Sequence, residues 1–250
     1  MNKEINIALP LADFLEFFLH IHQLNGILIN NISNYSNKID VIVKTEGILK
    51  KYKPETYSST EEEIRSKHKE HLEAAHKEIS EDFYSIKNSE LIMLYSRFES
   101  AITEVIYLIF NSSSYNELPN IDNSKLNILD VLKMEKSEQK VFIADLYIQQ
   151  KTTGVKYGYN RFEAILEPLI GKSNLKKETQ DSLFRFAQIR NLLTHKNGVV
   201  DKQFKALLSD SKQYIGKRII IDDEIMSLCI SSIIEYSSEI IDRLNKLKAR

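Results

Sequence analysis

The stretch Asp181-Ser-Leu-Phe-Arg-Phe-Ala-Gln-Ile-Arg-Asn-Leu-Leu-Thr-His-Lys-Asn-Gly198 has the pattern of a core-facing helix with a defined end. Its apolar side chains recur at the spacing that places them on one face of an α-helix. These residues are Leu183, Phe186, Ala187 and Leu193. Lys196-Asn197-Gly198 adds a basic last turn and residues that accept a left-handed backbone, which is typical of a helix end. The sequence therefore predicts a helix that packs on a core and stops at Asn197-Gly198.

Glycine and proline are scarce along the whole chain, with 7 Gly and 4 Pro among 250 residues. Because both residues disfavour helix interiors, their scarcity favours long helices and few tight turns. We therefore expect an all-α fold, with Arg218-Ile-Ile-Ile221 as a short strand or extended segment. The helix over 60–110 is expected either to run through or to break near Asn88. Helices are expected over residues 11–30, 39–52, 60–110, 128–134, 137–149, 161–170 and 223–248.

Two of the expected helices carry apolar stripes that predict a buried face. The stripes are Leu91, Leu94, Tyr95, Phe98, Ile102, Val105 and Ile109 in one, and Ile225, Leu228, Cys229, Ile233, Tyr236 and Ile240 in the other. Cys229, the one cysteine, is expected to be a buried thiol, and a lone cysteine suits a reducing compartment. No apolar run approaches the ~20 residues that span a bilayer. We expect a cytoplasmic protein that does not enter a membrane.

A linker is predicted between Tyr52 and Thr60, where Pro54 interrupts the helical pattern and Thr60 precedes three glutamates. Thr is a favoured N-cap, and acidic residues suit a first helical turn. This linker divides the chain into an N-terminal helical layer over residues 1–58 and a helical domain over 59–250. One continuous domain is the alternative.

The segment Arg190-Asn191-Leu192-Leu193-Thr194-His195 has the richest chemistry in the chain. Arg is a permanent cation whose fork of donors matches phosphate geometry, and His exchanges a proton near neutral pH. Asn191 and His195 share a helix face, whereas Arg190 and His195 lie roughly 140° apart around a helix. Either Arg190 reaches across with its long side chain, or His195 lies on a loosened last turn. The residue types suggest chemistry on a phosphodiester.

This hexapeptide resembles the signature of the HEPN superfamily, an arginine followed after a short spacing by a histidine, often with asparagine directly after the arginine. Leu94-Tyr95-Ser96-Arg97-Phe98-Glu99-Ser100 is similar to the serine- and glutamate-bearing helix that precedes the signature in many members. The resemblance covers residues 85–250 or so. HEPN toxins paired with nucleotidyltransferase antitoxins often carry a tyrosine two residues after the histidine. Asn197 stands at that position here, which places the chain outside that group.

The resemblance implies a HEPN-like helical bundle with extra N-terminal helices, acting as a metal-independent endoribonuclease that needs no cofactor. It implies a homodimer with a composite active site, and products with 2′,3′-cyclic phosphate and 5′-hydroxyl ends. His195 would activate the 2′-hydroxyl or protonate the leaving oxygen, Arg190 would hold the phosphate, and Asn191 would orient one of these groups. Stand-alone relatives are often toxins or antiviral abortive-infection effectors, restrained by an antitoxin or sensor protein.

The charge distribution fits an RNA partner, although the net charge of the chain is only −1. Residues 171–218 contain 11 Lys and Arg against 4 Asp and Glu, a local balance of +7 that leaves −8 elsewhere. A basic segment around a candidate phosphate site is what RNA binding requires. We expect Lys196, Arg185 and Glu99 to contact the substrate. The alternative is an ordinary mixed helical surface.

Two further alternatives stay open. The first alternative is a non-catalytic HEPN-like module that uses Arg190 to bind RNA or a protein partner. In this alternative His195 is a solvated residue at the helix end. His68, His71 and His76 suggest a metal site, but their spacing differs from the pattern of zinc hydrolases. A solvated helix face is the simpler interpretation of these histidines, and we expect no metal.

Overall fold

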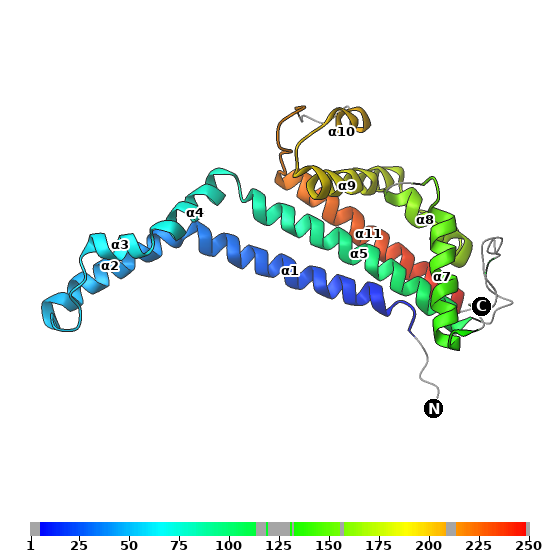
Figure 1. Ribbon diagram of the computed structural model, residues 1–250, viewed down its shortest axis with the longest axis horizontal. Coiled ribbons are helices and arrows are strands. Elements are labelled where there is room, and N and C mark those ends of the chain that lie inside the picture. The colour runs from blue at the N-terminus through cyan, green and yellow to red at the C-terminus, as the bar shows by residue number, and fades with distance from the viewer. Residues whose placement is uncertain are drawn as a thin grey trace. The chain divides into compact units, whose positions relative to one another are not determined.

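The computed structural model describes residues 6–113, 119, 131, 133–155, 158–208 and 214–248, and this part of the chain is all-α (Figure 1). The predicted fold class is therefore confirmed. The described helices are α1 (Leu9–Ser33), α2 (Tyr35–Tyr52), α3 (Glu61–Lys67), α4 (Lys69–Ser80), α5 (Tyr84–Ser112), α7 (Lys136–Thr152), α8 (Gly158–Ile170), α9 (Lys177–Lys196), α10 (Lys202–Leu207) and α11 (Asp223–Lys248). Among these helices, none is both long and apolar enough to cross a membrane.

Most predicted helices lie where they were expected, but the long one over 60–110 is broken in two places. Thr60 caps α3 as predicted, since its Oγ1 accepts from Glu63 N at 3.2 Å while Glu63 Oε2 accepts from Thr60 N at 2.7 Å. The chain then breaks at His68 and again at Asp82-Phe83, not near Asn88. Asp82 and Phe83 have φ of 52° and 56°, and two consecutive left-handed residues end a right-handed helix. The helix expected over 128–134 falls largely outside the described residues.

The contacts group the chain into two units, one of Met1–Phe18 with Leu91–Arg250 and one of Leu19–Glu90. This division differs from the predicted boundary at residue 58. The reason lies in α1, whose first turns bury Leu11, Phe14 and Phe18 in the core of the larger unit. Phe14 packs there on Phe98 of α5, with ring centroids 5.4 Å apart.

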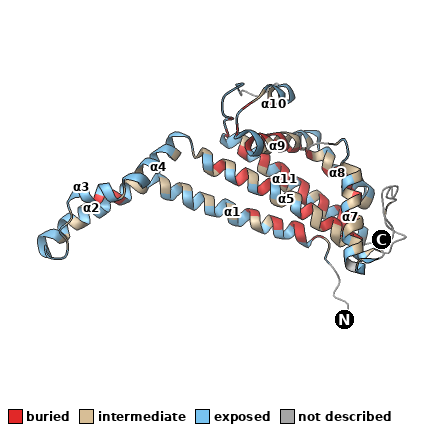
Figure 2. Ribbon diagram, viewed as in Figure 1, coloured by how far each residue is buried: buried red, intermediate tan, exposed pale blue. Residues whose placement is uncertain are grey.

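The core of the larger unit lies between α5, α8, α9 and α11, whose buried faces are red in Figure 2. All seven residues of the predicted α5 stripe are buried, as are the four predicted apolar residues of α9. In α11, Cys229 is 2% exposed, which confirms the buried thiol. The predicted burial of Leu228 in the α11 stripe was wrong, because this residue is 45% exposed.

Gly158 sets the close approach of α8 to α9. It has φ of +64°, and a Cβ built at this position would lie 2.9 Å from Cα of Phe184 in α9. A side chain here would meet both backbone strain and a backbone collision. Glycine therefore allows α8 to begin directly against the helix that carries Arg190 and His195.

The end of α9 follows the predicted stop signal. Asn197 and Gly198 have φ of 50° and 74°, and Gly198 N donates to Leu192 O at 3.1 Å. The chain returns at Arg218, which forms one isolated antiparallel bridge with Val199. Residues 218–221 are therefore an extended segment and not a strand, because the described residues contain only this isolated bridge.

Candidate functional site

Arg190 lies in α9 with its guanidinium held on three sides. Its Nη2 is 3.4 Å from Glu99 Oε2, and its Nη1 donates to Asn191 Oδ1 at 3.2 Å. The guanidinium also lies over the ring of Tyr95, 5.6 Å from the centroid. The side chain is 23% exposed, so it is partly shielded yet open to solvent. An arginine fixed in this way loses little further freedom when it binds an anion.

Glu99 joins a second arginine to this group, which we call the Arg190 cluster (Tyr95, Glu99, Arg161 and Arg190). Arg161 Nη1 donates to Glu99 Oε1 at 3.1 Å, so one carboxylate serves two guanidinium groups. The three charged side chains sum to one positive charge. Arg190 Nε is also buried without a hydrogen-bond partner among the described residues. The cluster thus retains an excess of charge and of donors, which favours an anion.

Tyr95 provides the aromatic floor of the Arg190 cluster. Burial raises the pKa of Tyr95, and the nearby Glu99 carboxylate raises it further. The ring therefore stays neutral, and its face contributes a cation–π contact to Arg190.

His195 is exposed and lines a pocket of about 180 Å³, which we call the His195 pocket. The helix continues through Lys196, so His195 lies in its last turn, where the N–H of the C-cap Asn197 donates five residues back to Leu192 O. Asn191, one turn earlier, lines the same pocket and also accepts from Arg190. Arg190 is not among the described residues that line this pocket. Asn191 is therefore the link between the Arg190 cluster and the His195 pocket.

The three residues predicted to contact substrate lie at three different sites. Lys196 lines the His195 pocket, and Glu99 belongs to the Arg190 cluster. Arg185 lines a separate, smaller and largely apolar pocket beside Ile189 and Cys229. The structure thus gathers five of the six predicted site residues on one stretch of α9 and α5, and places Arg185 apart from them.

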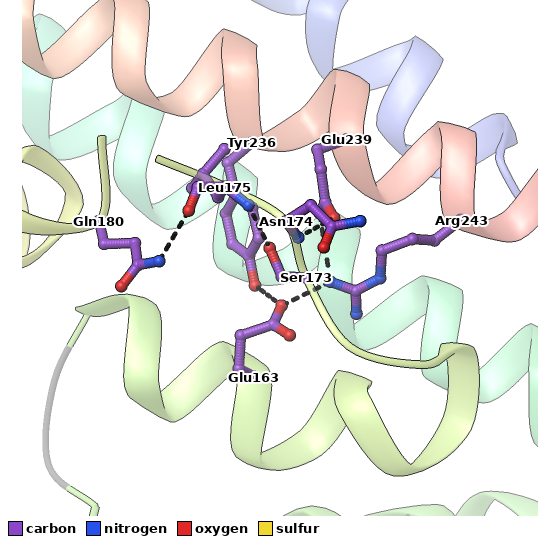
Figure 3. A network of polar contacts seen from close by, with 8 residues as sticks. All are labelled: Glu163, Ser173, Asn174, Leu175, Gln180, Tyr236, Glu239 and Arg243. Carbon is purple, nitrogen blue, oxygen red and sulfur yellow. Dashed lines mark hydrogen bonds and ion pairs between the residues drawn. The ribbon is translucent and has the colours of Figure 1, made fainter. Parts of the chain in front are cut away.

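A buried polar network that was not predicted from the sequence lies between α8 and α11 (Figure 3). Glu163 of α8 accepts hydrogen bonds from Tyr236 and from Arg243 Nη1, the latter at 2.8 Å, and all three side chains are buried. Arg243 Nη1 also donates to Glu239 Oε2 at 3.2 Å, and Glu239 Oε1 accepts from Asn174 N at 3.2 Å. Burial raises the pKa of Tyr236, and the Glu163 carboxylate raises it further.

This network ties α8 and α11 to the connection that leads into α9. Its sequence signal is the position of Arg243, which follows Ile240 by three residues and so continues the apolar stripe of α11. A charged residue in such a stripe indicates a buried ion pair, because an unpaired buried charge is costly. The network is therefore a support for the site and lies outside it.

Three histidines of the smaller unit, His68, His71 and His76, contact hydroxyl groups. Tyr35 Oη lies 3.1 Å from His68 Nδ1 and 3.2 Å from His71 Nδ1, and Ser36 Oγ lies 3.1 Å from His76 Nε2. Within the described ranges, no three His, Cys, Asp or Glu side chains converge as metal ligands would. His71 and His76 are exposed, and His68 is half-buried.

Comparison of the chain with protein-family models, with curated proteins and with solved structures gave no match. The chemistry of the Arg190 cluster and the His195 pocket is therefore the basis for a function.

Proposed function

We propose that this chain is a HEPN-like endoribonuclease that cuts RNA without a metal ion. The observation that carries the proposal is the position of Asn191, which accepts from Arg190 and lines the pocket that His195 lines. A guanidinium, an amide and an imidazole thus follow one another along the last turns of one helix, within the basic segment. Phosphodiester transfer uses a cation that stabilises charge on the phosphate and a group that transfers a proton, and Arg190 and His195 are of these types.

The proposed step is attack of a ribose 2′-oxygen on the adjacent phosphorus. The imidazole of His195 takes the 2′-hydroxyl proton, the new P–O bond forms, and the bond to the 5′-oxygen breaks. A proton delivered to that oxygen gives a 5′-hydroxyl, and the other product ends in a 2′,3′-cyclic phosphate. Such proton transfer contributes about 10²–10⁴-fold to the rate. Arg190 and Arg161 stabilise the charge that develops on the phosphate.

A homodimer completes the site in this proposal. One concerted step needs a base for the 2′-hydroxyl and an acid for the leaving oxygen, and each chain offers one His195. A two-fold axis that brings two copies together provides both groups from one sequence position. We extend the proposal to a cytoplasmic toxin or antiviral effector, restrained by an antitoxin or sensor protein.

The second candidate is a non-catalytic module that binds RNA or a protein through Arg190. One observation favours it: Arg190 is paired with Glu99 and does not line the His195 pocket in the single chain. Binding without turnover would then be the function.

Product analysis separates the two candidates. Purified protein is incubated with single-stranded RNA in excess EDTA, and the new ends are identified by their response to phosphatase and to polynucleotide kinase. The nuclease gives 2′,3′-cyclic phosphate and 5′-hydroxyl ends in EDTA. RNA that is bound but left intact supports the non-catalytic module instead, and cutting that EDTA abolishes contradicts the metal-independent mechanism.

A further inference from the structure

The His195 pocket has two walls with different origins. Gln188, Asn191 and His195 follow one another at three- and four-residue steps, so they form one face of α9. The opposite wall is α10 with its N-cap, Asp201, and the side chains of Gln203 and Phe204. This second wall was not predicted from the sequence.

The α10 wall is built into the fold. Asp201 Oδ1 accepts from Phe204 N at 2.7 Å, which caps the helix, and Phe204 is buried. The residue before the cap, Val200, pairs in both directions: its N donates to Lys217 O at 2.9 Å and its O accepts from Gly216 N at 2.8 Å. The pocket therefore has two defined walls in the free chain.

The size of the pocket selects a small ligand. Its volume of about 180 Å³ is several times the ~30 Å³ that one water occupies in the liquid. It is also below the ~300–1,000 Å³ of pockets that hold drug-sized molecules. One ring system fits such a space.

The lining selects a ligand with a polar edge. Gln188, Asn191 and Gln203 present amides, and amides match the paired donor and acceptor atoms of nucleobase edges. Gln188 is only 6% exposed, and its Nε2 has no hydrogen-bond partner among the described residues. A buried donor without a partner is costly, and Gln188 would reach an acceptor atom on a ligand by turning its amide toward the pocket that it lines.

We propose that the His195 pocket binds one nucleobase of RNA, next to the phosphate that lies at His195. The inference rests on the proposed function for its substrate class, RNA, and adds to it a site for base recognition. Gln188 and Gln203 contact the edge of the base. Lys196 at the rim attracts the neighbouring phosphate.

Binding of 2′-O-methyl RNA tests the inference separately from cutting, because this RNA has no 2′-hydroxyl to attack. A short oligonucleotide is made with one abasic residue at each position in turn, and its affinity is measured by fluorescence anisotropy. We expect one abasic position to weaken binding to the wild-type chain about tenfold, which corresponds to about 1.4 kcal/mol. In Gln203→Ala and in Gln188→Met, this loss should shrink to less than about twofold. Gln149→Ala, an exposed glutamine of α7, should behave as wild type.

The outcomes are distinct. An abasic scan that is flat in the wild-type chain, or a loss that persists unchanged in both pocket variants, overturns the nucleobase pocket. Unmodified RNA of the same sequence is tested for cutting in parallel. Intact RNA in that assay contradicts the proposed nuclease activity and leaves the nucleobase pocket unaffected, since base recognition is measured by anisotropy.

Discussion

Arg190 Nη2 and Glu99 Oε2 lie 3.4 Å apart, and the two side chains are 23% and 25% exposed. The carboxylate thus orients the guanidinium and at the same time cancels part of its charge. Arg161 makes the balance positive, because it shares the same carboxylate. We therefore propose that Glu99 positions the two arginines, and its contact with substrate stays a prediction.

Neutralising this carboxylate should separate binding from cutting. In Glu99→Gln we expect RNA affinity to rise about two- to fivefold, since one negative charge leaves the site and partly exposed pairs are worth up to about 1 kcal/mol. The rate of cutting should fall about tenfold, because Arg190 loses its orientation. Anisotropy and single-turnover cleavage measure the two quantities.

Glu104→Gln is the matched control for that variant. Glu104 also lies on α5 and pairs with an arginine, Arg97, at 3.0 Å. A charge effect without positioning would give both variants the same cleavage rate, and equal rates would contradict the assigned role of Glu99.

Replacing only one residue of the buried Glu163–Arg243 pair should lower the free energy of unfolding strongly. Arg243→Met leaves Glu163 charged and buried, and breaking such a pair costs about 3–5 kcal/mol. The double variant Glu163→Leu/Arg243→Met should regain part of this loss, because the buried charge of Glu163 is removed, while Tyr236 and Glu239 still each lose a partner. Urea unfolding followed by circular dichroism measures both. A double variant less stable than either single one would show that the pair is not the source of the effect.

Alanine variants at Gly158 and Gly154 separate the cost of backbone strain from the cost of a collision between a new Cβ and the backbone of α9. Both have positive φ, but a Cβ at Gly154 meets nothing within 4 Å, whereas one at Gly158 meets Phe184. Gly154→Ala should cost only the left-handed strain, about 1–2 kcal/mol. Gly158→Ala should cost more, since α8 must also move away from α9. Equal changes in unfolding free energy would exclude the close approach.

Stability should fall as the solution becomes alkaline. Burial raises the pKa of Cys229 to about 12, above the value of about 8.5 for a free thiol. Below about pH 8.5 the thiol is neutral in both the folded and the unfolded state, so its contribution to the free energy of unfolding is fully present. Between about pH 9 and the folded pKa only the unfolded thiol ionises, so the unfolding free energy drops by about 1.4 kcal/mol per pH unit.

Cys229→Ala isolates this contribution from that of the buried tyrosines. Burial also raises the pKa of Tyr95 and Tyr147, so the slope above about pH 10 has several sources. The variant should lose stability less steeply than wild type from about pH 9 upward. Parallel curves for the two proteins would contradict the buried thiol.

Periodicity and stop signals predicted much of the fold. The α5 stripe, the Thr60 cap and the Asn197-Gly198 end of α9 follow local rules that a sequence displays directly. The break at Asp82-Phe83 was missed because neither residue is a glycine or proline. The division into two units falls inside α1 and α5, which are continuous helices, where linker composition gives no signal.

The candidate site was predictable only in part. Arg190, Asn191 and His195 were found because their chemistry is concentrated in six residues. The α10 wall and the Arg161 contact depend on long-range packing that no local pattern encodes. Arg185 was included for its charge alone, and helix phase places it at another pocket.

Cleavage of single-stranded RNA by His195→Ala tests the nuclease most directly. We predict that the wild-type chain cuts in EDTA and that His195→Ala is slower by at least about 10²-fold, with an unchanged circular dichroism spectrum. His20→Ala, which removes an exposed histidine of α1, should cut as wild type. Cleavage by His195→Ala at the wild-type rate would contradict the account.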